Sequence, residues 1–149
     1  MDLSPSEVRE QILAQHMALR GMLERLEVRA RMLLQGKRQG EATLREEFQV
    51  FGRHLREHLE LEERILVPAL READAWGEER VARFQEEHAR QREIMDGLVR
   101  AVTDSPYEFA LMIWGFVRLL QEDMAEEEKV SLNERVLRDT PIQTSVEPE

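Results

Sequence analysis

The stretch LREEFQVFGRHLREHLELEERILVPA, residues 44–69, decides the fold. Its apolar residues recur at steps of three and four, a spacing that places side chains on one face of an α-helix. Two ionisable residues interrupt this stripe, which consists of Leu44, Phe48, Phe51, Leu55, His58, Glu62, Ile65 and Ala69. The pattern predicts a long amphipathic helix whose buried face carries a histidine and a carboxylate.

A second stretch repeats this pattern at an offset of 65 residues, so that Asp123 corresponds to His58 and Glu127 corresponds to Glu62. Its stripe consists of Phe109, Ile113, Phe116, Leu120, Asp123, Glu127 and Val130. The correspondence suggests two helix hairpins related by approximate internal two-fold symmetry.

Two further stripes are each interrupted by one histidine. The first consists of Ile12, His16, Leu19, Leu23, Leu26, Ala30 and Leu33. The other consists of Val81, Phe84, His88, Gln91, Met95, Leu98 and Val102. Each stripe again has the helical spacing.

Helix starts are readable at two Ser-Pro pairs. Ser4 and Pro5 precede Glu7, and together they form the sequence of a capping box with proline at the first helical position. Ser105 and Pro106 repeat this arrangement. Taken with the breaks between the stripes, these signals predict four helices, at 6–35, 41–72, 78–102 and 106–138.

The predicted fold is all-α, an antiparallel up-down-up-down four-helix bundle that occupies residues 1–138. Long helices with short connections and one apolar stripe each favour this arrangement. Residues 139–149 contain two prolines and no apolar periodicity, so we expect a flexible C-terminal tail there.

Composition and charge exclude or disfavour several classes of function. The 31 Asp and Glu residues outnumber the 21 Lys and Arg residues, and the net charge of −10 disfavours nucleic acid and anionic membranes as partners. There is no cysteine, so thiolate metal sites are excluded. We find no segment long and apolar enough to cross a bilayer and no signal peptide, and we expect a cytoplasmic protein.

Six ionisable residues stand at positions where the stripes predict core. They are His16, His58, Glu62, His88, Asp123 and Glu127. Charged groups are found in an apolar interior only when they are paired, neutralised or bound to metal. Residues four apart share a helix face, so His58 with Glu62, and Asp123 with Glu127, each form a two-pronged unit.

A cation is the compensation that we favour. Six nitrogen and oxygen ligands, two of them carboxylates able to bridge, suit a pair of iron ions, with manganese or zinc as alternatives. The competing hypothesis is a buried salt-bridge network in which Arg20, Arg56 or Arg92 turns inward. His54 lies one turn before His58 and reads as a boundary histidine or a spare ligand, and we favour the former.

The segment HLELEERILVPAL, residues 58–70, resembles the second-helix signature of hemerythrin-like, or HHE cation-binding, domains. That signature is His-x-x-x-Glu-Glu followed by Leu-x-Pro-x-Leu. Gln15-His16, Glu87-His88 and Asp123-x-x-x-Glu127 fall where the family places its other ligands. The resemblance covers residues 6–138.

The resemblance implies a non-haem di-iron centre. Glu62 and Glu127 are similar to the family's bridging carboxylates, and the histidines are similar to its terminal ligands. We expect His16 and His58 on one metal ion, and His88 and Asp123 on the other.

The chain departs from the family at two positions. Phe84 stands where oxygen-carrying hemerythrins place a further histidine, and Asp123 stands where the family usually has a fourth-helix histidine. A carboxylate in place of an imidazole hardens the ligand set, which favours ferric iron and disfavours reversible oxygen carriage.

The sequence therefore predicts a metal-binding protein that binds, reduces or senses dioxygen, peroxide or nitric oxide, or senses iron. Two alternatives stay open at this point. One is a non-enzymatic interaction module in which a structural metal or a salt-bridge network holds the bundle together, and the other is iron storage or delivery. Neither a catalytic residue nor a protein partner can be assigned from the sequence.

Overall fold

The computed structural model describes residues 2–36 and 40–140, and within these residues every regular element is a helix. The elements are α1 (Pro5–Leu34), α2 (Glu41–Leu61), the π-helical segment η2 (Glu62–Leu66), α3 (Val67–Ala73), α4 (Gly77–Val99) and α5 (Pro106–Val130). Because α2, η2 and α3 follow one another without a break, the elements make four long helical runs. The prediction of an all-α protein with four helices is confirmed.

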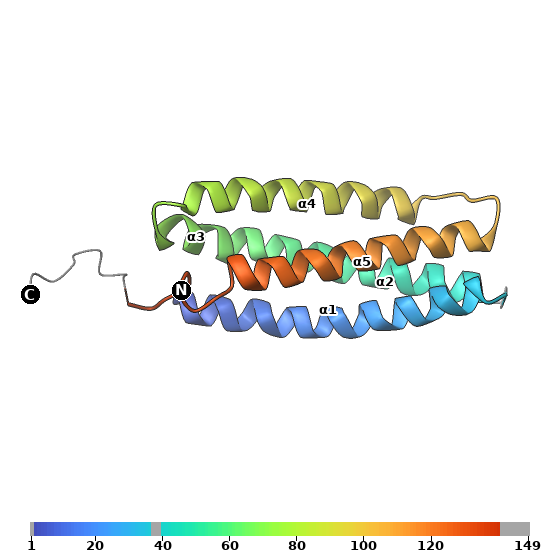
Figure 1. The fold of residues 1–149 in the computed structure, drawn as a ribbon, viewed down its shortest axis with the longest axis horizontal. Coiled ribbons are helices and arrows are strands. Elements are labelled where there is room, and N and C mark those ends of the chain that lie inside the picture. The colour runs from blue at the N-terminus through green and yellow to red at the C-terminus, as the bar shows by residue number, and fades with distance from the viewer. Residues whose placement is uncertain (1, 37–39, 141–149) are drawn as a thin grey trace, which may run out of the picture.

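Figure 1 shows the four helical runs lying side by side along the long axis of the molecule. The connection between α3 and α4 lies at the end where α1 begins and α5 ends. The connection between α4 and α5 lies at the opposite end. In the part of the chain that the structure describes, no helix has the length and apolar character needed to span a bilayer. The cytoplasmic location stays a prediction.

Both Ser-Pro starts cap their helices. The Ser4 hydroxyl accepts from the Glu7 backbone N–H at 3.3 Å, and the Glu7 carboxylate accepts from the Ser4 N–H at 3.1 Å. These two bonds complete the capping box, which satisfies backbone donors that a helix leaves unpaired at its first turn. The Ser105 hydroxyl accepts from the Glu108 N–H at 3.3 Å and starts α5 in the same way.

The fourth helix ends earlier than predicted, at Val130 and not at 138. Asn133 provides the reason. Its side-chain amide donates to the Lys129 carbonyl at 2.9 Å, while its side-chain oxygen accepts from the backbone N–H of Val136 at 2.9 Å. Asparagine competes in this way with the backbone hydrogen bonds of a helix. The turn also lets Leu132, Val136 and Leu137 pack in the core.

The residues after this turn run back to the start of α1. The Asp139 carboxylate accepts from the backbone N–H of Ser6 at 2.9 Å and from its hydroxyl at 2.7 Å. The predicted flexible tail, 139–149, thus begins with a residue that is tied to α1. Its residues 141–149 lie outside the described residues, and tail flexibility stays a prediction.

The second helical run contains one π-helical turn directly at the proposed ligands. In η2 the Val67 N–H bonds to the Glu62 carbonyl, five residues earlier. Pro68 follows this turn. Proline lacks an N–H and its ring clashes with the carbonyl four residues before it, so a regular α-helix is disfavoured at this point. Single π-turns inside α-helices often lie at functional sites.

The apolar core forms two clusters. The larger one is built from the second half of α1 with α2, α4 and α5, and it includes Leu23, Phe48, Met95 and Ile113. The smaller one includes Val8, Ile12, Leu66, Leu70, Val81 and Phe84. On α1, α2–η2 and α4 the predicted polar residues lie between members of one cluster and members of the other. A polar layer therefore crosses the interior of the bundle.

Candidate metal centre

The polar layer contains buried ligand-type side chains from all four helical runs. His16 lies on α1, His58 on α2, Glu62 at the start of η2 and His88 on α4, and all four are buried. Glu127 on α5 joins them with a side chain that is 10% exposed. Groups of this kind are found in an apolar interior only when other charges or a metal compensate them.

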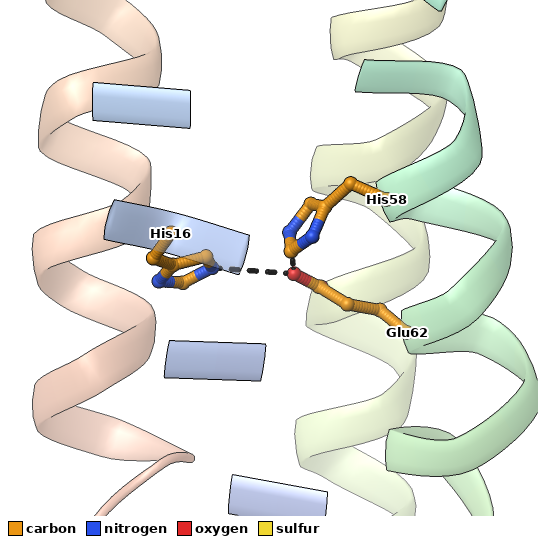
Figure 2. A group of neighbouring side chains, drawn as sticks. All are labelled: His16, His58 and Glu62. Atoms are coloured by element: carbon orange, nitrogen blue, oxygen red, sulfur yellow. Dashed lines mark hydrogen bonds and ion pairs between the residues drawn. The ribbon is translucent and has the colours of Figure 1, made fainter. Parts of the chain in front are cut away.

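Two groups of these side chains have ligand atoms within 4.8 Å of one another. The first group is His16, His58 and Glu62. Figure 2 shows the two imidazole rings converging on one carboxylate oxygen. His16 Nε2 lies 3.3 Å from Glu62 Oε1, and His58 Nε2 contacts the same oxygen. His58 reaches it because it precedes Glu62 by one helical turn.

The second group is Glu62, His88 and Glu127. His88 Nε2 lies 3.1 Å from Glu62 Oε2, the oxygen that the first group does not use. Glu127 Oε1 lies 3.4 Å from His16 Nε2, so the second carboxylate also approaches both groups. Glu62 therefore belongs to both groups and directs one oxygen toward each.

The outward-facing nitrogens of two histidines are held by hydrogen bonds. His16 Nδ1 lies 2.7 Å from Glu128 Oε2, and Arg20 bonds to the same carboxylate at 2.7 and 3.0 Å. His58 Nδ1 lies 2.6 Å from Gln15 Oε1. Partners of this kind set the tautomer and orient a metal-ligating imidazole, and they leave Nε2 free for the metal.

His88 has a looser arrangement of the same type. Its Nδ1 lies 3.7 Å from Glu63 Oε2, which is an ion-pair distance and too long for a hydrogen bond. Arg92 holds the Glu63 carboxylate at 2.9 Å. Glu63, Glu126 and Glu128 flank the proposed ligands along their helices. The structure brings Glu63 and Glu128 to these nitrogens and leaves Glu126 exposed.

The two buried carboxylates have opposite pKa shifts. Burial raises the pKa of Glu62, but hydrogen bonds from His16, His58 and His88 outweigh burial and hold this pKa well below its usual range. Burial, together with the negative charge of Glu62, raises the pKa of Glu127 well above its usual value. Glu62 is thus the anionic centre of the cluster.

His16 takes up the positive charge that this centre attracts. Burial lowers its pKa, but the nearby carboxylates of Glu127 and Glu62 outweigh burial and raise the pKa to about 10. Without a metal, a proton on His16 thus compensates the carboxylates. A cation in the cluster would displace this proton, because a ligating imidazole is neutral.

The donor set fits a metal cation better than it fits an arginine network. Among the described residues, no arginine forms an ion pair with Glu62 or Glu127. The three candidate arginines pair elsewhere: Arg20 with Glu128, Arg56 with Asp96, and Arg92 with Glu63. Glu127 Oε1 and His88 Nδ1 are buried and have no hydrogen-bond partner within the described chain. Nitrogen and oxygen donors without sulfur suit iron, manganese or zinc.

Asp123 is the one predicted ligand that the structure does not bring into either group. Its carboxylate accepts from Gln91 Nε2 at 2.9 Å, and Arg90 lies 3.3 Å from both of its oxygens. It lies one turn before Glu127, as His58 precedes Glu62, but it packs toward α4. Direct ligation by Asp123 stays a prediction.

The structure also shows the positions of two further residues noted in the sequence, His54 and Phe84. His54 is exposed, away from both groups. Phe84 is buried, and its ring centroid lies 3.9 Å from that of His88. An apolar ring therefore stands beside His88 at the position where the resemblance led us to note the lack of a further histidine.

A small cavity of about 10 Å³ reaches the cluster, and a space of this size holds about one water molecule. His58, Glu62, His88 and Glu127 line one part of it. Most of the rest is apolar and includes Leu19, Leu23, Phe51, Leu55, Leu120 and Met124. Gln91 completes the lining. Gln91 stands in a core stripe of the sequence, and its polar side chain in that stripe is the only sequence signal for a role.

A family model described as the Hemerythrin HHE cation binding domain matches residues 8–133, which is most of the chain. Searches of curated proteins and of solved structures gave no significant match.

Proposed function

This chain belongs to the hemerythrin HHE cation-binding domain family, and on that premise we propose that it holds two iron ions and uses them to bind, reduce or sense a small molecule. Dioxygen, peroxide and nitric oxide are the candidates. Manganese or zinc are the alternative metals. The proposal includes an antiparallel up-down-up-down order of the helices, which the connections at alternating ends support.

One observation carries the proposal. The two oxygens of Glu62 serve two different ligand groups, with His16 and His58 on one side and His88 on the other. A single ion would use a carboxylate from one side, whereas two ions can share one that bridges. Glu127, which approaches both groups, is the second candidate bridge.

The ligands then have separate tasks. His16 and His58 are proposed as terminal ligands of one ion, and His88 as a terminal ligand of the other. Two iron ions held this way supply redox-active Lewis acids that can clamp a small molecule. The protein keeps bulk water out with the apolar lining of the cavity, and Glu128 and Gln15 hold the imidazoles of His16 and His58 in place.

Anaerobic loading with ferrous iron tests the proposal. We expect about two iron ions per chain and a visible absorption change when nitric oxide or dioxygen is added. Glu62→Gln keeps the shape of the side chain but removes its charge, so it should abolish most iron binding. Glu60→Gln makes the same change at an exposed position of α2 and serves as the matched control. A spectrum that stays featureless in iron-loaded wild-type protein would contradict the proposal.

A structural metal is the second candidate, because the cluster joins all four helical runs between two apolar clusters. In that case metal loading raises the melting temperature, but nitric oxide and dioxygen cause no spectral change. The two measurements on one sample separate the candidates.

A further inference from the structure

Gln91 is the polar residue of the cavity that belongs to neither ligand group. It lies on α4 one turn beyond His88, and it is only 7% exposed. The other polar residues that line the cavity are His58, Glu62, His88 and Glu127, which the metal would occupy. A small molecule at the metal would therefore meet hydrocarbon on its remaining sides, except at the Gln91 amide.

Asp123 determines how this amide is oriented. Gln91 Nε2 donates to Asp123 Oδ2 at 2.9 Å. An ionised carboxylate only accepts hydrogen bonds, so the amide must turn its NH₂ group, and not its oxygen, toward Asp123. Arg90 bonds to both oxygens of Asp123 at 3.3 Å and holds the carboxylate in place.

One donor of Gln91 remains after this bond is made. The amide NH₂ group carries two hydrogens, and the bond to Asp123 uses one of them. Within the described chain, Gln91 makes no other side-chain hydrogen bond. Because Gln91 lines the cavity, its second amide hydrogen is available to a molecule bound there.

We propose that Gln91 donates a hydrogen bond to the small molecule bound in the cavity, and that Asp123 is a positioning residue that acts through Gln91. The inference rests on the proposed function, because it requires a ligand at the metal. The ligand class is the one of the proposed function, a diatomic or peroxide-sized molecule with an acceptor atom. Asp123 thereby gains a role without coordinating the metal.

Nitric oxide release from ferrous protein tests the role of Gln91. Gln91→Met and Gln91→Leu remove the donor and keep an apolar side chain of similar bulk. We expect unchanged iron content and nitric oxide release about fivefold faster, the effect of one net hydrogen bond. Gln49→Leu makes the same change at an exposed position of α2 and should leave the rate unchanged.

Asp123→Ala tests the positioning role. It removes the acceptor, so we expect faster nitric oxide release at unchanged iron content. Asp123→Asn keeps an acceptor oxygen and should restore most of the slow release. In metal-free protein, NMR should show the Gln91 side-chain amide hydrogens exchanging slowly in wild type and faster in Asp123→Ala. This last measurement does not depend on iron.

The outcomes separate the inference from the function on which it rests. Wild-type protein that binds neither iron nor nitric oxide would overturn the proposed function and the inference with it. Wild-type binding with an unchanged release rate in both Gln91 variants would overturn the inference alone. Loss of iron from Asp123→Ala would identify Asp123 as a ligand and would also overturn the positioning role.

Discussion

At the scale of single residues, Glu62 is the group around which the centre is organised. It is completely buried, and its two oxygens contact histidines from three different helices. A buried carboxylate with three imidazole partners stays ionised, which is why its pKa is held low while the pKa of Glu127 rises. Glu62 is thus held in its anionic form, whereas Glu127 more readily binds a proton.

The hydrogen bond between His16 and Glu128 gives a prediction about metal affinity. Glu128→Gln weakens the acceptor of His16 Nδ1 and its bond to Arg20. Loss of such an outer partner typically weakens metal binding about 10–100-fold, so we expect this increase in the metal dissociation constant. Metal titration measures it. Glu126→Gln, an exposed position of the same helix, is the control, and equal effects of the two variants would contradict the prediction.

The raised pKa of His16 gives a prediction for metal-free protein. The pKa rises from 6.5 to about 10 on folding. The folded state therefore binds a proton that the unfolded state has lost, and this contribution to stability is complete below pH 6.5. It should decline as the pH rises from 6.5 and be lost above about 10.

Chemical denaturation in the presence of chelator, at several pH values across this window, measures the decline. His16→Gln should remove most of the decline, whereas His54→Gln at an exposed position should leave it intact. A free energy of unfolding that stays constant across the window in wild-type protein would refute the assignment to His16.

At the scale of elements, local irregularities place the centre. The π-turn of η2 begins at Glu62. It lets His58 and Glu62 face inward together with the apolar residues Leu66 and Leu70. An uninterrupted α-helix would continue the stripe at Ile65 and Ala69, as the sequence pattern predicted, but these two residues are only partly buried. The extra residue of the π-turn moves the buried stripe on by one position, to Leu66 and Leu70. Pro68 disfavours that uninterrupted helix.

The end of α5 gives a prediction about stability. Asn133→Ala removes the side-chain bonds to Lys129 and Val136 that stop the helix. Loss of such a cap costs about 1–2 kcal/mol of the free energy of unfolding, which urea denaturation measures. Asn133→Asp retains the acceptor oxygen and should lose less. An alanine variant as stable as wild type would show that the turn is held by its buried leucines.

At the scale of the whole molecule, the polar layer divides the interior. The apolar residues form two separate clusters, and the cluster of ligands lies between them. A metal that binds there would tie the four helical runs together, so metal occupancy and global stability should be coupled.

Metal loading should therefore raise the melting temperature. At a free metal concentration about 1,000 times the dissociation constant, binding adds about 4 kcal/mol, which corresponds to about 10 °C for a domain of this size. Differential scanning calorimetry with and without metal measures the shift. Glu62→Gln should abolish it. An equal shift in that variant would mean that the stabilising metal binds elsewhere.

Much of this molecule was predictable from the sequence because local rules encode it. Steps of three and four define the buried face of each helix, and Ser-Pro-x-Glu sequences define two helix starts. Both signals involve residues within one or two helical turns, so they do not depend on the rest of the chain. The family signature at residues 58–70 likewise depends on neighbours along one helix, and the family match confirmed it.

The partners of the buried polar side chains and the end of the fourth helix depend on tertiary packing, because residues far apart in the sequence compete for these contacts. Asp123 and Glu62 both stand at core positions of their stripes, yet Glu62 meets three imidazoles while Asp123 meets Arg90 and Gln91. Periodicity specifies the face on which a side chain lies, but its partner depends on which charges the neighbouring helices present. The local sequence around Asn133 is likewise compatible with a continued helix or with its end. Burial of Leu132 and Val136 in the core favours the end. Electrostatic and packing energies between helices therefore decided the ligand geometry that the helix patterns left open.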